Sequence, residues 1–241
     1  MIKRIEVDIP VVILCGGRGV RLAPLTEEIP KPLVTIGKRP ILWHVMNIYA
    51  SYGFRRFILC LGYKAHQVKD YFIKNNEDNW DITLVDTGID SSKSQRLLKI
   101  KNLIREKLFF LAYGDDVADI NIQNLLKLHI RSNVLATVTA VNKVSDYGVM
   151  EIGRENLITN FKEKPRLNLW VNAGFMVLQK KMFDFLKNGE LESVIFSELA
   201  RRRKICAYRH KGQWCSMNTL KDYIELNKLW QEGGAFWKVW K

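Results

Sequence analysis

The sequence is poor in the features that mark secreted, zinc-binding and membrane proteins. Its four cysteines, in 241 residues, form no C-x-x-C pair, which argues against a disulfide framework and a tetrahedral zinc site. No apolar run approaches the roughly 20 residues that cross a bilayer. The N-terminus carries acidic residues where a signal peptide has an apolar stretch. We therefore expect a soluble, cytoplasmic protein with no membrane partner.

Acidic side chains are also in short supply. The 25 Asp and Glu residues face 38 Lys and Arg residues, so the formal net charge is +13. An excess of this size favours an anionic partner: a nucleic acid, a membrane surface or a small polyanion such as a nucleotide. No recognised nucleic-acid motif is present, and the basic run 201–204 ends a predicted helix, where cations usually face solvent. We therefore expect no nucleic-acid partner.

The chain also lacks internal repeats and any linker rich in Pro, Gly or Ser, so residues 1–241 are predicted to form one domain. In its first half, short apolar runs alternate with segments of helical periodicity. This alternation predicts an α/β fold: a Rossmann-like, mixed but mostly parallel twisted sheet with helices on both faces. We expect strands at about 11–15, 57–61, 82–85, 108–112, 136–141, 148–152, 157–162 and 171–178, and helices at about 40–52, 65–74, 194–203 and 220–231.

A glycine-rich turn follows the first predicted strand. Gly16, Gly17 and Gly19 would let backbone N–H groups approach phosphate oxygens, and Arg21 adds a positive charge. The dinucleotide-binding fingerprint is excluded because Leu22 stands where it needs a third glycine. A P-loop is excluded as well, since no Gly-Lys-Ser/Thr ends the turn. The turn therefore indicates phosphate binding of another kind, or a simple turn.

Two further residues suit phosphate and metal chemistry. Lys31 lies between Pro30 and Pro32, which hold it in an extended segment from which its ammonium can reach a phosphate. Asp115 follows Gly114 at a strand end, where a hard carboxylate can hold Mg²⁺. Taken alone, each has a plainer interpretation, as a solvated loop lysine and as an Asp-rich turn.

The motifs G-G-x-G-x-R, P-K-P, Y-G-D, E-K-P and N-x-G occur in this order along the chain. Together they resemble the sugar-nucleotide pyrophosphorylases, also called nucleotidylyltransferases. Within that family the sequence is most similar to the cytidylyltransferases that act on glucose 1-phosphate. The similarity extends over nearly the whole chain and includes segments 40–46, 83–88, 113–119 and 213–220.

The resemblance implies a reaction and its partners. A sugar 1-phosphate, first of all glucose 1-phosphate, would attack the α-phosphorus of CTP in line and give CDP-sugar and pyrophosphate, with Mg²⁺ as cofactor. Residues 1–135 would bind the nucleotide, and residues 136–241 would bind the sugar phosphate and the other subunits of a homo-oligomer. Three alternatives stay open: another nucleoside triphosphate, another phosphorylated acceptor, or a catalytically weakened regulatory protein that binds nucleotides.

The resemblance also implies roles for individual residues. The catalytic groups would be Arg21, Lys31, Asp115 and Lys164. The nucleotide would be bound by Leu14, Gly16, Gly17, Gly19, Val20, Ser91, Arg96 and Gly114. The sugar phosphate would be bound by Tyr147, Gly148, Glu163, Asn172 and Gly174. The metal would be held by Asp115 and Asn218.

The sequence departs from the family pattern at three of its positions. Val20 replaces a threonine, which removes one hydroxyl contact to the phosphates. Gln95 replaces a glycine of a flexible lid. Asn218 replaces the second aspartate of the metal site, and because an amide oxygen carries no charge, we expect weaker Mg²⁺ binding. Asp116 is the neighbouring carboxylate that could compensate.

The remaining features receive structural interpretations. His44, His66, His129 and His210 lack metal-ligand spacing and are expected to be packing or surface residues. The aromatic tail 236–240 is expected to be exposed and to form a subunit contact.

Overall fold

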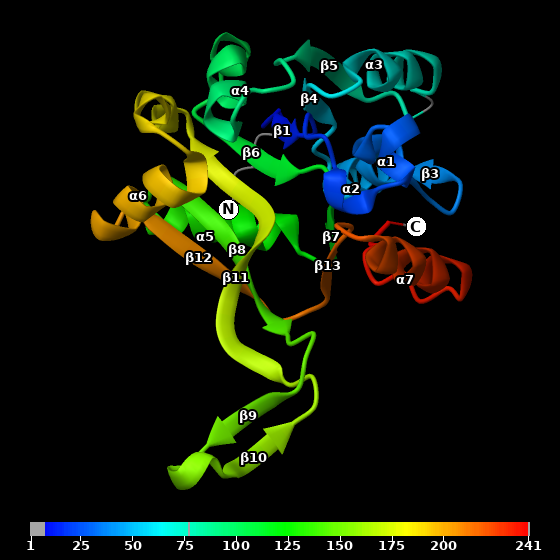
Figure 1. Ribbon diagram of the computed structural model, residues 1–241. Helices are drawn as coiled ribbons and strands as arrows, with labels where there is room; N and C mark the ends of the chain where they lie inside the picture. Colours follow the sequence, from blue (N-terminus) through cyan, green and yellow to red (C-terminus); the bar gives the residue numbers. More distant parts are fainter. Residues whose placement is uncertain (1–7, 77, 241) are drawn as a thin grey trace.

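A seven-stranded sheet lies at the centre of the computed structural model, which describes residues 8–76 and 78–240 (Figure 1). Its strand order is β12-β8-β11-β6-β1-β4-β5, and β11 runs antiparallel to both of its neighbours while the other pairs are parallel. The strands are β1 (Val11–Leu14), β4 (Arg56–Leu61), β5 (Asp81–Asp86), β6 (Leu108–Tyr113), β8 (Ala136–Val144), β11 (Arg166–Gln179) and β12 (Ile205–His210). The predicted mixed, mostly parallel sheet is confirmed.

Strand β1 shows why an unbroken apolar run forms the middle of this sheet. Val11, Val12 and Ile13 are wholly buried, because β1 lies between β4 and β6 and is covered on both faces. Val11 and Ile13 join the core on one face and Val12 joins the core on the other, as the two-residue period of a strand requires. Burial on both faces leaves no position in β1 for a polar side chain.

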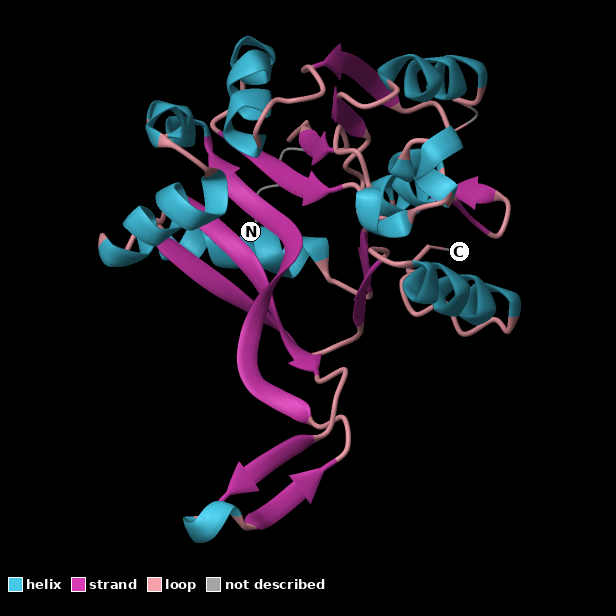
Figure 2. Cartoon of the chain, in the orientation of Figure 1, coloured by secondary structure: helices cyan, strands magenta, loops and turns pink. Residues whose placement is uncertain are grey.

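Helices cover both faces of the sheet (Figure 2). One core is shared with α2 (Ile41–Ala50), α3 (Ala65–Lys74), α5 (Ile122–Ser132) and α7 (Leu220–Gln231). The other core is shared with α4 (Lys93–Ile100), the π-helical segment η7 (Leu191–Phe196) and α6 (Ser197–Arg201). Within the described residues, no helix is both long enough and apolar enough to cross a membrane.

The predicted strands are all present, but several elements differ from expectation. The edge strand β12 of the central sheet was not expected. The helix expected at 194–203 is instead η7 followed by α6, which ends at Arg201. Helices α4 and α5 were not expected. In α4 the side chain of Ser92 accepts a hydrogen bond from Gln95 N, and the Gln95 side chain accepts one from Ser92 N. Gln95, which replaces a glycine of the family pattern, therefore belongs to a capping box at the start of a helix.

Two short sheets flank the central sheet, and one of them brings distant segments together. Strand β7 (Asp116–Ala118) pairs with β13 (Trp214–Ser216), and Met217 N donates to Asp115 O at 2.9 Å. This pairing places the segment that contains Asn218 beside the end of β6. The other pair is β2 (Thr35–Ile36) and β3 (Arg39–Pro40), which lies near α1 (Leu25–Glu28) and α2.

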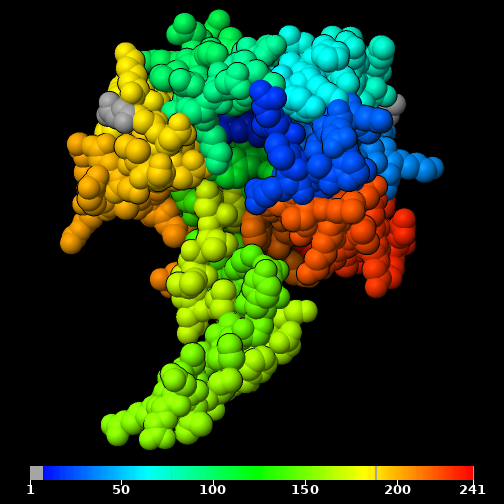
Figure 3. Space-filling model, in the orientation of Figure 1, coloured from blue at the N-terminus to red at the C-terminus, as the bar shows by residue number. Residues whose placement is uncertain are grey.

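A two-stranded arm projects from the body of the protein (Figure 3). It consists of β9 (Val149–Ile152), β10 (Ile158–Lys162) and their flanking residues, and we call residues 145–165 the β9–β10 arm. The long strand β11 leads from the arm back into the sheet. The arm exposes a series of apolar side chains, namely Val149, Met150, Ile152, Leu157, Ile158 and Phe161.

The aromatic tail lies against its own chain, so the expectation that it is exposed is wrong. Trp237 is wholly buried, and its Nε1 donates to His44 Nδ1 at 3.3 Å. The opposite ring nitrogen of His44, Nε2, lies 3.0 Å from the carbonyl oxygen of Ile36. Trp230 and Trp240 also pack against the His44 ring. An amphipathic ring such as indole satisfies both the core and the buried histidine, which accounts for the burial of this tail.

The histidines are packing or surface residues, as expected. His44 and His129 are buried, and His66 lies on the surface. His210 has a partner that its spacing did not predict, since its Nε2 lies 2.8 Å from Asp119 Oδ1. The thiols are free, with Cys15 and Cys60 buried and Cys206 and Cys215 partly buried.

Candidate active site

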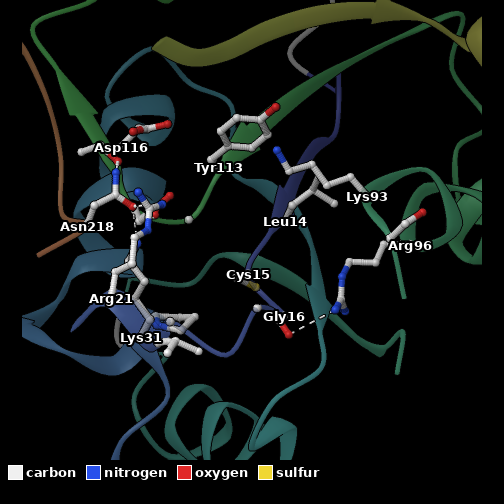
Figure 4. A pocket seen from close by; sticks show the side chains of 18 of the residues that line it. Leu14, Cys15, Gly16, Arg21, Lys31, Lys93, Arg96, Tyr113, Asp116 and Asn218 are labelled. Atoms are coloured by element: carbon white, nitrogen blue, oxygen red, sulfur yellow. Dashed lines mark hydrogen bonds and ion pairs between the residues drawn. The ribbon is translucent and has the colours of Figure 1, made fainter. Parts of the chain in front are cut away.

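A cavity of about 810 Å³ lies at the carboxyl ends of β1 and β6 (Figure 4). In the sheet, β4 lies on one side of β1 and β6 lies on the other side, and the chain passes from β1 to β4 first. The cavity therefore occupies a topological switch point of the sheet. Ligands of open α/β sheets bind at such points. Residues from β1, the turn after it, α4, β6 and β13 line the cavity.

The glycine-rich turn forms one side of the cavity. Gly16, Gly17, Gly19, Val20 and Arg21 all line it, in agreement with the sequence expectation. Gly19 adopts the left-handed conformation with φ 66°, which favours glycine, and it precedes the short helical turn 20–22. The Val20 side chain is 72% exposed, so it presents a methyl surface to the cavity where a hydroxyl would offer a hydrogen bond.

Lys31 connects the two expected metal ligands. Its ammonium forms an ion pair with Asp115 Oδ2 and donates to Asn218 Oδ1 at 3.0 Å. Arg21 Nη2 donates to the same amide oxygen at 3.0 Å, whereas Asn218 Nδ2 donates to Ser216 Oγ at 2.8 Å. These bonds orient the amide of Asn218 with its oxygen toward the cations. The structure therefore brings Arg21, Lys31, Asp115 and Asn218 together.

The oxygens of Asp115 and Asn218 could hold a divalent cation. Both oxygens contact one ammonium, that of Lys31, so a single cation can touch both. They supply one carboxylate and one neutral amide, and in the described part of the chain no group of three or more His, Cys, Asp or Glu residues could hold a metal ion. This donor set fits Mg²⁺ that takes its remaining ligands from phosphates and water, and it does not fit an all-protein site.

Asp116, the neighbouring carboxyl that could compensate for Asn218, is buried. Burial and the neighbouring charge of Asp115 raise the pKa of the Asp116 carboxyl well above its usual value, which favours the neutral form. The carboxyl lies against Gly174, where an added Cβ would come within 2.0 Å of Asp116 Oδ2. Gly174 has φ 79° and leaves the space that this carboxyl needs.

Arg96 lines the cavity, but backbone groups occupy its guanidinium. Nη1 donates to Leu61 O at 2.9 Å and to Thr87 Oγ1 at 2.7 Å. Nη2 donates to Gly16 O at 3.2 Å and to Ile89 O at 3.1 Å. The side chain is 5% exposed. Arg96 therefore holds the glycine-rich turn against the ends of β4 and β5, whereas the sequence predicted that it contacts the nucleotide directly.

The other predicted nucleotide-binding residues lie in the cavity wall. Leu14 and Gly114 line it at the ends of β1 and β6. Ser91 lines it at the start of α4, where its hydroxyl donates to Thr87 O and accepts from Lys99 Nζ at 2.9 Å.

The predicted acceptor residues are divided by the structure. Asn172 lines the cavity and Gly174 lies beside it, behind Asp116. Tyr147, Gly148, Glu163 and Lys164 belong to the β9–β10 arm and do not line the cavity. Tyr147 is 79% exposed, and Lys164 pairs with Glu163 at 4.0 Å on the surface. The sequence placed these four residues in the site because of their motifs, and it gave no information on the direction in which the arm projects.

Sequence reasoning missed several residues around the cavity, among them Lys93, Trp214 and Glu192. Lys93 and Trp214 line it, and Glu192 lies behind Tyr113. Lys93 forms an ion pair with Glu192, and Trp214 Nε1 donates to Ala173 O at 3.0 Å. The spacing S-x-x-Q at residues 92–95 is a capping-box signal that could have predicted α4 and placed Lys93 in its first turn. No sequence signal points to Glu192.

Comparison with known proteins decides the family. The family model described as nucleotidyl transferase matches residues 10–233. The chain belongs to this family. A Bacillus subtilis protein named a probable glucose-1-phosphate cytidylyltransferase is 39% identical, over 95% of this chain and 99% of that protein. The glucose-1-phosphate cytidylyltransferase of Salmonella typhimurium is 34% identical, also over 95% of this chain and 99% of that protein.

Solved structures show the same fold as this nucleotidyl transferase. HddC from Yersinia pseudotuberculosis, complexed with GMP-PN, gives a TM-score of 0.72 at 24% identity and covers 92% of this chain and 99% of its own. A UDP-glucose pyrophosphorylase complexed with UDP-glucose gives 0.73 at 20% identity, over 94% and 99%. The resemblance to sugar-nucleotide nucleotidylyltransferases drawn from the sequence motifs is confirmed.

Proposed function

We propose that this nucleotidyl transferase moves a cytidylyl group from CTP to glucose 1-phosphate and releases CDP-glucose and pyrophosphate. The names of relatives that are 39% and 34% identical over nearly the full chain support this substrate pair. The observation that carries the reaction type is the convergence of Arg21 and Lys31 with the glycine-rich turn in one cavity beside Asp115. Such a site suits a triphosphate and a second phosphate.

The chemistry requires positioning and charge neutralisation. An oxygen of the sugar 1-phosphate forms a bond to the α-phosphorus of CTP, and the bond from that phosphorus to the β-phosphate oxygen breaks. The backbone N–H groups of the turn 16–19 bind the triphosphate, and Arg21 and Lys31 stabilise the negative charge that develops during transfer. No side chain needs to form a covalent intermediate.

Asp115 and Asn218 would hold Mg²⁺ against the phosphates. The ion supplies a Lewis acid that neutralises phosphate charge. The Lys31 ammonium bridges the two oxygens that would hold the ion.

We also propose that the working form is a cytoplasmic homo-oligomer in which the β9–β10 arm packs on a second copy of the chain. Six apolar side chains of the arm are exposed, and a two-stranded sheet is marginally stable without cover. Its acceptor-side residues Glu163 and Lys164 also lie away from the cavity of their own chain. The four free thiols agree with a reducing compartment.

A matrix of nucleotides and acceptors tests the proposal. Pyrophosphate release is measured with CTP, UTP, dTTP, ATP and GTP against glucose 1-phosphate and other sugar 1-phosphates. The expected result is highest kcat/KM with CTP and glucose 1-phosphate. A preference for another nucleotide or acceptor would change the proposed substrates but not the proposed nucleotidyl transfer. Tight CTP binding with no turnover at saturating Mg²⁺ would instead favour a regulatory nucleotide-binding protein. This is the second candidate function, because Val20 and Asn218 depart from the family pattern at the phosphate and metal positions.

A further inference from the structure

A second charged group lies in the cavity wall, apart from Arg21, Lys31 and Asn218. It consists of Lys93 in the first turn of α4 and Glu192 in η7. Figure 4 shows Lys93 beside Tyr113 and Leu14, across the cavity from Arg21, Lys31 and Asn218. The phosphate chemistry of the proposed function leaves this pair without a role.

Glu192 holds Lys93 and Tyr113 in one arrangement. Its Oε1 accepts hydrogen bonds from both Lys93 Nζ and the Tyr113 hydroxyl. The Lys93 ammonium lies 4.2 Å from the centre of the Tyr113 ring, within cation–π range. Burial opposes the ionisation of Glu192, but the hydrogen bonds from Lys93 and Tyr113 outweigh it and lower the pKa of the carboxyl. The Glu192 carboxyl is therefore ionised at neutral pH.

The same wall includes a residue from the acceptor half of the chain. Asn172 Nδ2 lies 3.4 Å from the Tyr113 hydroxyl, and Asn172, Tyr113 and Lys93 all line the cavity. The Lys93 side chain is 43% exposed, so its ammonium is accessible to a ligand. An ammonium has three N–H donors, and among the described residues one of them is used, in the bond to Glu192.

The charge of the pair indicates which ligand group it suits. Glu192 neutralises Lys93, so a second phosphate or a carboxylate would gain little from this wall and would meet the carboxylate of Glu192. A neutral hydroxyl can accept a hydrogen bond from Lys93 without such repulsion, and a second hydroxyl can bond to the Asn172 amide. The wall therefore matches the hydroxyl groups of a neutral sugar ring.

Resting on the proposed function, we propose that Lys93 is a specificity-determining residue that binds a ring hydroxyl of the acceptor sugar. Glu192 is a positioning residue that fixes the Lys93 ammonium on the Tyr113 ring. The phosphate of the acceptor lies toward Arg21 and Lys31, and its ring lies over the wall of Lys93, Tyr113 and Asn172.

The test removes the charge and keeps the length of the side chain. In Lys93→Met, the KM for glucose 1-phosphate is expected to rise about 10- to 100-fold, as for a lost hydrogen bond to a charged group. The KM for CTP should change by less than about 3-fold. Lys93→Arg keeps a cation and should recover part of the affinity. Glu192→Gln should raise the acceptor KM to a smaller extent, since Lys93 remains but loses its anchor.

Deoxy analogues identify the hydroxyl. The wild-type enzyme is assayed with the 2-, 3-, 4- and 6-deoxy derivatives of glucose 1-phosphate. At one ring position the wild-type should discriminate against the deoxy compound, and Lys93→Met should lose that discrimination. The matched control is Lys101→Met, which removes a lysine with the same 43% exposure whose partner is Asp184 at 3.9 Å. Lys101 lies outside the cavity lining, so Lys101→Met should leave kcat and the KM values for CTP and for the acceptor unchanged.

Two results would overturn the proposal. One is an unchanged acceptor KM in Lys93→Met. The other is an equal rise of the KM for CTP and for the acceptor, which would show that Lys93 only holds α4 in place. If the wild-type transfers nothing to glucose 1-phosphate, the proposed function fails separately, and calorimetric titration with sugar 1-phosphates then tests Lys93. A loss of affinity of about tenfold or more in Lys93→Met supports its role, and an unchanged affinity contradicts it.

Discussion

The amide oxygen of Asn218 accepts a hydrogen bond from the ammonium of Lys31 at 3.0 Å. Lys31 also pairs with Asp115, so one cation already bridges the two oxygen donors of the candidate metal site. A neutral amide competes less strongly for Mg²⁺ than a carboxylate would. The metal requirement of this enzyme should therefore depend on residue 218.

Asn218→Asp is expected to lower the Mg²⁺ concentration for half-maximal activity by about tenfold, which corresponds to about 1.4 kcal/mol. The measurement is a Mg²⁺ titration of pyrophosphate release at saturating substrates, with metal affinity by calorimetry in the presence of CTP as a second readout. Asn124→Asp adds the same charge at an exposed position of α5 and serves as the control. An unchanged Mg²⁺ titration in Asn218→Asp would show that the missing carboxylate is not the limiting ligand.

Val20→Thr adds a hydroxyl on the glycine-rich turn, where the present side chain is 72% exposed in the cavity wall. One new hydrogen bond to a phosphate should lower the KM for CTP by about 3- to 10-fold. The melting temperature should stay constant, because the Val20 side chain has little contact with the core. Steady-state kinetics with CTP as the varied substrate check this. A rise in the KM for CTP would show that the hydroxyl of the new threonine does not face the triphosphate.

Arg96→Met removes four hydrogen bonds to Gly16, Leu61, Thr87 and Ile89 and leaves buried acceptors without a donor. We expect the free energy of unfolding to fall by about 2–4 kcal/mol. Denaturant titration measures it. Arg18→Met is the control, since the Arg18 pair with Asp90 is exposed and should contribute about 0–1 kcal/mol. Full stability of Arg96→Met together with loss of CTP binding would assign Arg96 to the ligand instead.

The stability of the protein should fall in mild acid because of His44 and His129. Burial lowers the pKa of each imidazole from 6.5 to about 4. The unfolded chain therefore takes up the protons first, so stability is full above pH 6.5 and decreases as the pH falls from 6.5 to about 4. The loss attributable to His44 is at most about 3 kcal/mol.

His44→Gln removes one of these protonations and can keep a donor and an acceptor near Ile36 and Trp237. Its melting temperature should decline less between pH 7 and pH 4.5 than that of the wild-type. His66→Gln, on the surface, should retain the wild-type slope. Parallel slopes for His44→Gln and the wild-type would contradict the role of His44.

The β9–β10 arm should determine the oligomeric state. Ile158→Lys places a charge on its exposed apolar face and is expected to dissociate the oligomer, as measured by sedimentation velocity. Ile73→Lys on α3 changes a residue that is 73% exposed away from the arm and should leave the mass unchanged. An oligomer that persists in Ile158→Lys would assign the interface to another surface.

The sequence predicted the centre of the fold and one side of the site. Val11–Leu14 and the other unbroken apolar runs had to be central strands, and the glycine-rich turn and Asp115 had to lie at their carboxyl ends. The direction of the β9–β10 arm depends on the course of β11 and leaves no local pattern, so the position of Lys164 was not predictable. The burial of Arg96 depends on three carbonyl groups and one hydroxyl from three separate segments of the chain, which no motif records. The acceptor half was therefore the part for which residue types alone were insufficient.

Strand β11 also constrains how the polypeptide can be divided. It comes from the second half of the chain, yet it lies between β6 and β8 and pairs with both. A fragment that stops at residue 135 would contain the whole glycine-rich turn but would leave the edge of β6 uncovered. Exposed strand edges promote self-association, so the two halves are expected to fold as one cooperative unit. During synthesis, the sheet that carries the glycine-rich turn should become stable only after residues 166–179 have left the ribosome.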